Sequence, residues 1–175
     1  MTDAPRPVEA ASISRRPTTV AAGLSVGGAA VVLSLTATGG PLALALAVVG
    51  AVCLGLGLHL GRHRVVDLAA LILFGAVALT GLAAPPEATL VAVVAVVVSW
   101  DLGCAAITLG AQLGRVAETA RLEVRYAASS LGVGLCAATL AYGAFVWGGG
   151  LSLDAVVVLL VVGVTATIAL GVRRN

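Results

Sequence analysis

Long apolar stretches, separated by short polar, glycine- or proline-containing links, dominate the hydrophobic pattern of this chain. Each stretch has about 20 residues, the length that an α-helix needs to cross the hydrocarbon core of a bilayer. The apolar runs lack the alternation of a membrane β-barrel, and lipid cannot satisfy the edges of an open sheet. The pattern predicts an all-α membrane protein, a bundle of six transmembrane helices. The expected spans are residues 18–38, 41–60, 66–84, 88–110, 127–147 and 153–172.

The polar segments complete the predicted organisation. Residues 1–17 contain three prolines and three arginines, and this composition is typical of a disordered tail. Residues 18–175 form the transmembrane domain, in which Pro41 suits the first turn of the second helix. Residues 111–126 are polar enough to leave the membrane and are expected to form an amphipathic cytoplasmic segment between the fourth and fifth spans.

The arginines orient the predicted bundle. All ten basic residues are arginines, and threading the chain six times places every one of them on the same side, whereas the opposite loops contain no base. Because basic residues collect in cytoplasmic loops, both termini are expected in the cytoplasm, and the protein is expected to be a multi-pass protein of the cell membrane. The ten are Arg6, Arg15, Arg16, Arg62, Arg64, Arg115, Arg121, Arg125, Arg173 and Arg174.

The first stretch has an alternative interpretation as an export signal. Ser14-Arg15-Arg16-Pro17 before an apolar run resembles the start of a twin-arginine signal. Against this, Thr18 and Thr19 stand where apolar residues are usual, and the run is longer than the 7–15 residues of a typical signal core. We expect an uncleaved first helix.

Composition supports a membrane protein and gives little sign of chemistry. The chain is 60% hydrophobic and only 10% charged, with a mean hydropathy of +1.12, whereas soluble domains carry about 25% charged residues. A net charge of +2 gives no support for nucleic-acid binding. The three cysteines are far apart and are expected to be reduced, and His59 and His63 lack a clear third ligand, so no metal site is expected. No catalytic residue set and no cofactor motif are visible.

Asp101 is the main candidate for a functional group. It is the only charged residue between Glu87 and Arg115, and a carboxylate inside a membrane usually faces protein or water. At the period of an α-helix, four polar residues fall within about 60° of one another. They are Asp101, Thr108, Gln112 and Arg115. Small residues form a nearly opposite face, at Gly103, Ala106, Gly110 and Gly114. Asp101 is interpreted either as a proton- or ligand-sensing carboxylate or as a structural group satisfied by neighbouring helices.

The segment that follows is a candidate surface for a partner. Glu118, Arg121 and Arg125 share one helical face, opposite an apolar stripe that includes Ala120 and Val124. This arrangement predicts a helix that lies along the membrane surface, docks a cytoplasmic partner or is simply a solvated linker.

The residues Trp100-Asp101-Leu102-Gly103, Leu109 to Arg115 and the helix with Glu118 and Arg121 resemble the central motif of an uncharacterised family of small haloarchaeal multi-pass membrane proteins. Members of that family are often encoded beside MoxR-type AAA ATPases. The resemblance implies a setting and no reaction, because the family has no assigned activity.

Two hypotheses for function follow from the sequence. The first is a non-enzymatic integral membrane component that assembles with other membrane proteins or with a cytoplasmic ATPase. The alternative is a small transporter or channel that uses Asp101 as an ion or proton site. A membrane enzyme would need a polar cluster made by tertiary contacts. Oligomeric state and partner identity are left open.

Overall fold

The computed structural model describes residues 17–113 and 120–147, and within these ranges all regular secondary structure is helical. The prediction of an all-α chain is confirmed. The sixth expected span, residues 153–172, lies outside the described residues. The described helices are α1 (Thr19–Thr36), a 3₁₀ turn η1 (Ala37–Gly39), α2 (Pro41–Leu60), α3 (His63–Thr80), α4 (Pro86–Leu113) and α5 (Ala120–Trp147).

In the described part of the chain, five helices are long and apolar enough to cross a membrane. The windows in α2 and α4 have a mean hydropathy of 2.3, and the lowest value, 1.5, belongs to α5. These helices indicate a multi-pass membrane protein.

The link between α2 and α3 is shorter than the sequence pattern predicted. Gly61 adopts a left-handed conformation (φ 62°) after the last residue of α2, and the N–H of Arg62 donates to Gly57 O at 3.0 Å. This is a Schellman ending, for which glycine is the preferred residue. Arg62 occupies the N-cap position of α3 without a side-chain capping bond, and α3 begins at His63 instead of near residue 66. Basic side chains suggest a loop at this point, but they are tolerated in the first turn of a helix whose end is exposed.

Helices α4 and α5 extend beyond the expected spans. Both have 28 residues, which corresponds to about 42 Å of helix against about 30 Å of hydrocarbon. The expected amphipathic segment 111–126 is therefore divided. Its first residues end α4, residues 120–126 begin α5, and residues 114–119 lie outside the described part of the chain.

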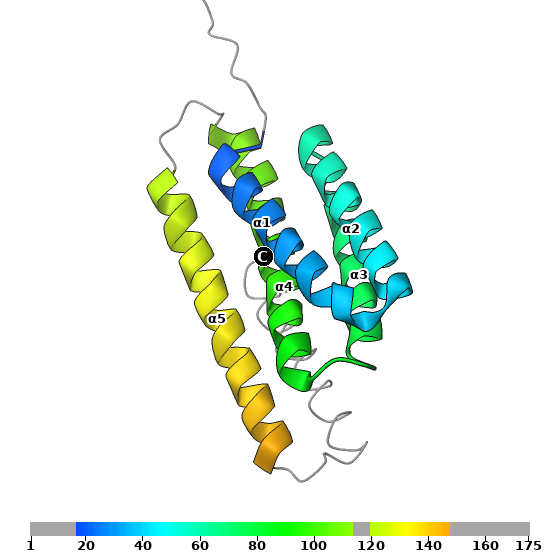
Figure 1. Ribbon diagram of the computed structural model, residues 1–175. Coiled ribbons are helices and arrows are strands. Elements are labelled where there is room, and N and C mark those ends of the chain that lie inside the picture. The colour runs from blue at the N-terminus through cyan, green and yellow to red at the C-terminus, as the bar shows by residue number, and fades with distance from the viewer. Residues whose placement is uncertain (1–16, 114–119, 148–175) are drawn as a thin grey trace, which may run out of the picture. The chain divides into compact units, whose positions relative to one another are not determined.

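The chain consists of two compact units, residues 1–135 and 136–175. In the first unit, α2 and α3 form an antiparallel hairpin, α1 packs along α4, and α3 also contacts α4 (Figure 1). The described part of the second unit is the end of α5, Cys136–Trp147, which is helical throughout.

Glycines bring α2 and α3 into close contact. A Cβ atom on Gly57 would lie 3.0 Å from Val66 N, and one on Gly50 would lie 3.2 Å from Leu73 N. Gly50 precedes Gly57 by seven residues on α2, and Leu73 follows Val66 by seven residues on α3, as expected for antiparallel helices. Leu54, which is 1% exposed, is buried between these two contacts. Small residues that let backbones approach are typical of helix packing in membranes.

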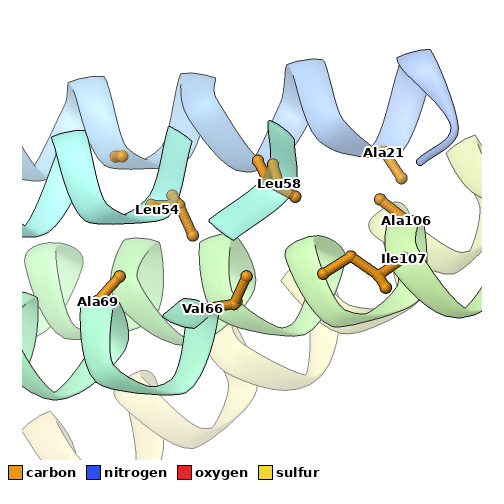
Figure 2. Packing of buried hydrophobic residues seen from close by; sticks show 8 residues of the cluster. Ala21, Leu54, Leu58, Val66, Ala69, Ala106 and Ile107 are labelled. Carbon is orange, nitrogen blue, oxygen red and sulfur yellow. The ribbon is translucent and has the colours of Figure 1, made fainter. Parts of the chain in front are cut away.

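A cluster of small and branched side chains joins α1, α2, α3 and α4. In Figure 2, Ala21 of α1 and Ala106 of α4 face one another, and Leu54 and Leu58 of α2 lie near Val66 of α3. A second cluster nearer the opposite end contains Val32, Ala47, Leu73, Ala76, Val77, Ala92 and Val96.

The four arginines in the described part of the chain lie at one end of the first unit. Arg62 and Arg64 stand at the α2–α3 link, and Arg121 and Arg125 stand in the first turns of α5. The start of α1 lies at this same end, because Thr18 N–H donates to Ala106 O on α4 at 3.2 Å. We call this the arginine end.

Candidate functional site around one turn of helix α4

Three consecutive residues of α4 form hydrogen bonds with three different helices. Ser99 bonds to α1, Trp100 to α3 and Asp101 to α5. We call residues 99–101 the polar turn. Consecutive helical residues point about 100° apart, so one turn reaches neighbours on three sides.

The contact with α1 is a reciprocal serine pair. Ser25 Oγ donates to Ser99 O, and Ser99 Oγ donates to Ser25 O, both at 2.6 Å. Both serines are fully buried. The backbones approach closely because Gly28 has no side chain; a Cβ there would lie 3.2 Å from Ala95 O. The pair thus fixes the position of α1 along α4.

The contact with α3 joins an indole to a carboxylate. Trp100 Nε1 donates to Asp67 Oδ1 at 2.8 Å, and Cys104 Sγ lies 4.0 Å from the same oxygen. Sequence reasoning missed this role of Asp67. A signal existed, because an acid in the first turns of an apolar helix needs a donor nearby.

The contact with α5 involves the predicted residue Asp101. Its Oδ1 accepts a hydrogen bond from Tyr126 Oη at 2.7 Å, and the Asp101 side chain is half-buried. The donor is a neutral phenol and not one of the arginines of the same end. Tyr126 was not among the predicted site residues.

Leu102 and Gly103, the next two residues of the motif that resembles the haloarchaeal family, are packed against other helices. Leu102 is 2% exposed, and a Cβ on Gly103 would lie 3.1 Å from Ser25 Oγ and 3.2 Å from Val66 Cγ1. Gly103, Ala106 and Gly110 are buried, so the small-residue face predicted for this helix is confirmed at these positions. Gly114 lies outside the described residues.

The structure places Asp101 in the half of α4 that is nearer the arginine end. Thr18 at the start of α1 is level with Ala106. Asp101 precedes Ala106 by five residues, about 8 Å along the helix axis. The last seven residues of α4 continue past that level for about 10 Å. Asp101 therefore lies about 8 Å inside the level at which α1 begins.

Glu123 is a further buried carboxylate that sequence reasoning missed. It is 3% exposed, the one described α5 side chain that is buried, and its Oε2 accepts the backbone N–H of Ala21 at 2.8 Å. Ala21 is the third residue of α1, whose own cap residue Thr18 forms no capping bond. A carboxylate at a helix N-terminus satisfies a free N–H and faces the positive end of the helix dipole.

At the start of α5, Glu123 is buried and its neighbours Leu122 and Val124 are exposed. Val124, assigned to an apolar stripe, is 54% exposed, while Glu123 points inward. Arg121 and Arg125 are exposed as expected. Glu118 lies outside the described residues.

The structure describes three of the four residues of the polar face predicted for α4. Thr108 Oγ1 donates to Cys104 O of its own helix at 2.9 Å, and Gln112 is exposed. Arg115 lies outside the described residues. Asp101 and Thr108 of this face thus form separate hydrogen bonds.

The histidines near the arginine end lie on different helices. His59 belongs to the last turn of α2, and His63 is the first residue of α3. Within the ranges that the structure describes, no group of three His, Cys, Asp or Glu side chains could hold a metal ion. The three cysteines, Cys53, Cys104 and Cys136, are free thiols.

Comparison with known proteins assigns most of the chain to one family. The match is to the "Family of unknown function (DUF7519)" and covers residues 15–168. Neither the curated proteins nor the solved structures gave a match. A helical chain with several membrane-length apolar helices, matched over most of its length, thus belongs to the DUF7519 family, whose function is unknown.

Proposed function

We propose that the chain is a non-enzymatic integral membrane component that assembles with another membrane protein or with a cytoplasmic ATPase. The polar turn of α4 carries this proposal. Each of its three side chains bonds to a different neighbouring helix. In a chain so poor in polar groups, these residues hold helices together.

The proposed topology has six spans with the arginine end in the cytoplasm. It rests on the four described arginines at that end and on the six-span interpretation of the sequence. Trp100 and Tyr126 near this end fit the aromatic residues common at a membrane interface.

The proposed topology is testable by labelling with a membrane-impermeant maleimide. Arg121→Cys and Leu82→Cys are made separately in a chain whose native cysteines are replaced by alanine. In intact cells, we expect labelling at position 82, which lies at the opposite end, and protection at position 121 until the membrane is opened. The reverse pattern contradicts the orientation.

The first turns of α5 provide the proposed docking surface for the partner. Burial of Glu123 against α1 leaves Arg121 and Arg125, four residues apart, on the exposed side. The resemblance to proteins encoded beside MoxR-type ATPases makes a cytoplasmic ATPase one candidate for this partner. Acidic side chains on the partner would complement the two arginines.

Purification from a mild detergent, with quantification of every co-purifying protein, tests this assembly. We expect a stoichiometric partner with the unaltered chain and its loss in Arg121→Glu/Arg125→Glu. The matched control, Arg62→Glu/Arg64→Glu, reverses two charges at the same end and should retain the partner. A chain that purifies alone, or equal loss in both variants, contradicts the proposal.

A second candidate function is a transporter or channel that uses Asp101. The observation in its favour is the half-buried Asp101–Tyr126 pair, two groups that can exchange a proton. Its position about 8 Å from the level of the start of α1 is shallow for a central gate. In reconstituted vesicles, Asp101→Asn should abolish ion or proton flux if this function is correct; unchanged flux excludes the role.

A further inference from the structure

A shallow groove of about 280 Å³ lies between α3 and α4, and its lining is almost wholly apolar. The residues around it are Asp67, Ala70, Leu71 and Phe74 of α3 and Trp100 of α4. The groove begins about one turn inside the start of α3. From Asp67 to Phe74 it extends over seven residues, which is about 10 Å along the helix axis. Leu71 is exposed, so the groove opens to the outside of the bundle, where lipid surrounds the helices.

The hydrogen bond between Trp100 and Asp67 explains how an apolar groove can lie beside a carboxylate. Trp100 Nε1 donates to Asp67 Oδ1 at 2.8 Å, so the N–H of the indole and one carboxylate oxygen satisfy one another. The indole ring is then left as an apolar wall. A groove of this kind suits an alkyl chain, because contact with apolar side chains needs no polar partner.

The basic groups nearest to the groove belong to the α2–α3 link. Arg62, His63 and Arg64 are all exposed, and no acidic residue lies between His59 and Arg64. Within residues 17–113 and 120–147, neither of the two guanidinium groups forms an ion pair. Arg64 and Leu71 are seven residues apart, so they lie within about 20° of one another around α3. A basic residue of the link and the apolar groove therefore share one side of this helix.

We propose that the α2–α3 link and the groove together bind an anionic phospholipid. The phosphate lies against Arg62 and Arg64, and one acyl chain lies along Leu71, Phe74 and the Trp100 indole. Guanidinium groups bind phosphate through several hydrogen bonds at once. Basic residues at the end of a membrane helix attract anionic lipid headgroups.

The order of the two parts along α3 supports a lipid as the occupant. The basic groups come first and the apolar groove follows, as a headgroup and its chain follow one another from the membrane surface inwards. This order is the same in either orientation of the bundle, so the site does not depend on the proposed topology. It is also separate from the proposed partner surface on α5.

Quenching of tryptophan fluorescence by brominated phospholipids tests the proposal on the full-length chain in uncharged maltoside micelles. The chain has two tryptophans, so Trp147→Phe leaves Trp100 as the reporter in the groove. The probes are phosphatidylglycerol and phosphatidylcholine with the same dibrominated acyl chains. We expect phosphatidylglycerol to quench Trp100 saturably, at concentrations at least about tenfold lower than phosphatidylcholine. In the control chain Trp100→Phe, the exposed Trp147 should be quenched equally by both lipids.

Variants in the Trp147→Phe chain identify the groups that recognise the headgroup. Arg62→Gln/Arg64→Gln should weaken quenching by phosphatidylglycerol about tenfold and leave quenching by phosphatidylcholine unchanged. Arg62→Lys/Arg64→Lys keeps the charge and should retain most of the preference. Arg121→Gln/Arg125→Gln removes the same charge at the same end and should leave the preference intact. Circular dichroism checks that each variant is folded.

The carboxylate beside the groove provides a test of the sign of the charge. Asp67→Asn keeps an acceptor for Trp100 and removes a negative charge near the phosphate, so binding of phosphatidylglycerol should be unchanged or tighter. Weaker binding in this variant would mean that the carboxylate itself recognises the headgroup, which contradicts an anionic ligand.

Three further outcomes would overturn the proposal. Equal quenching of Trp100 by the two lipids means that the groove has only the ordinary contact of any helix surface with lipid. Equal losses in the two arginine-to-glutamine variants mean that the total charge of this end, and not the α2–α3 link, attracts the lipid. Displacement of phosphatidylglycerol by millimolar glycerol phosphate means that the link binds a free phosphate group without help from the groove.

Discussion

The α2–α3 and α1–α4 contacts solve the same packing problem with different chemistry. Both bring backbones together at glycines, Gly50 and Gly57 in the first contact and Gly28 in the second. The α2–α3 contact is lined by apolar side chains such as Leu54 and Leu73. The α1–α4 contact also contains the reciprocal Ser25–Ser99 hydrogen bonds and is bordered by Glu123.

The length of the intervening chain explains this difference. Only Gly61 and Arg62 separate α2 from α3, so the link itself fixes how the two helices align. Ser25 and Ser99 are 74 residues apart, and no short link restrains α1 against α4. Lipid provides no hydrophobic force between helices, so close packing and directional hydrogen bonds must set their position. We therefore expect substitutions that add volume to destabilise the α2–α3 hairpin most. Substitutions that remove a hydrogen bond should instead destabilise the α1–α4 contact.

The largest effect is expected from Gly57→Ala in the hairpin. The added Cβ would lie 2.9 Å from Val66 Cγ2 and 3.0 Å from Val66 N, and the backbone atom cannot rotate away. Overpacking of this kind costs about 1–3 kcal/mol. Thermal unfolding in maltoside, followed by circular dichroism, should show a lower midpoint.

Gly55→Ala is the matched control on the same helix. Nothing lies within 4 Å of a Cβ at this position, so the substitution should be neutral or stabilise by up to about 1 kcal/mol through helix propensity. Equal effects at the two positions would mean that α2 and α3 are not in the close contact described.

Glu123→Ala should have the next largest effect. It removes the acceptor for Ala21 N–H and leaves that donor buried, which costs about 1–2 kcal/mol for a lost helix cap. Glu123→Gln retains an oxygen acceptor and should lose less. The free energy of unfolding measures both.

Glu87→Ala provides the comparison for Glu123→Ala. Glu87 lies in the first turn of α4 but is exposed, so its loss should destabilise the chain less. If the two alanine variants were equally stable, Glu123 would not secure the start of α1.

The bounds of the described helices show how much of the fold the sequence predicts. Apolar stretches of membrane length predicted the helices, because lipid requires each crossing segment to satisfy its own backbone. For α2, the expected range 41–60 is the observed helix Pro41–Leu60. The starts of α3 and α5 differ because helical structure continues into polar residues, which hydropathy assigns to loops. Helix α3 also ends at Thr80, four residues before the expected end, because residues 81–84 form turns and a bend.

The candidate site was harder to predict, because its contacts join distant parts of the chain. Asp101 stood out as a lone acid, but its partner Tyr126 lies 25 residues later. Helical periodicity grouped Arg121 and Arg125 on one face of this segment and gave no position to Glu123. Glu123 is buried, and its carboxylate accepts the N–H of Ala21 in the first turn of α1. Periodicity within one helix does not indicate which hydrogen-bond donors a neighbouring helix presents.

A smaller loss is expected from removal of the serine hydroxyls. Ser25→Ala and Ser99→Ala keep a small residue at the close contact and each remove one interhelical hydrogen bond. Such bonds contribute about 0.6 kcal/mol on average in a membrane protein, so the double variant should lose about 1 kcal/mol. Ser34→Ala removes an exposed hydroxyl that bonds within α1 and serves as the control. A double variant as stable as this control would argue that packing alone fixes α1 against α4.

The smallest effect is expected from Tyr126→Phe, which removes the phenol that donates to Asp101 and keeps the ring. Because Tyr126 is 45% exposed and Asp101 is half-buried, water or lipid headgroups can replace part of the lost bond, and we expect a cost of about 0.5 kcal/mol or less. Asp101→Asn should have a similarly small effect on unfolding, since an amide oxygen still accepts the hydroxyl. A double-mutant cycle of the two substitutions measures their coupling directly. A coupling as large as that of the serine pair would show that the Asp101–Tyr126 hydrogen bond holds α5 against α4. No coupling would mean that this hydrogen bond does not stabilise the contact between the two helices.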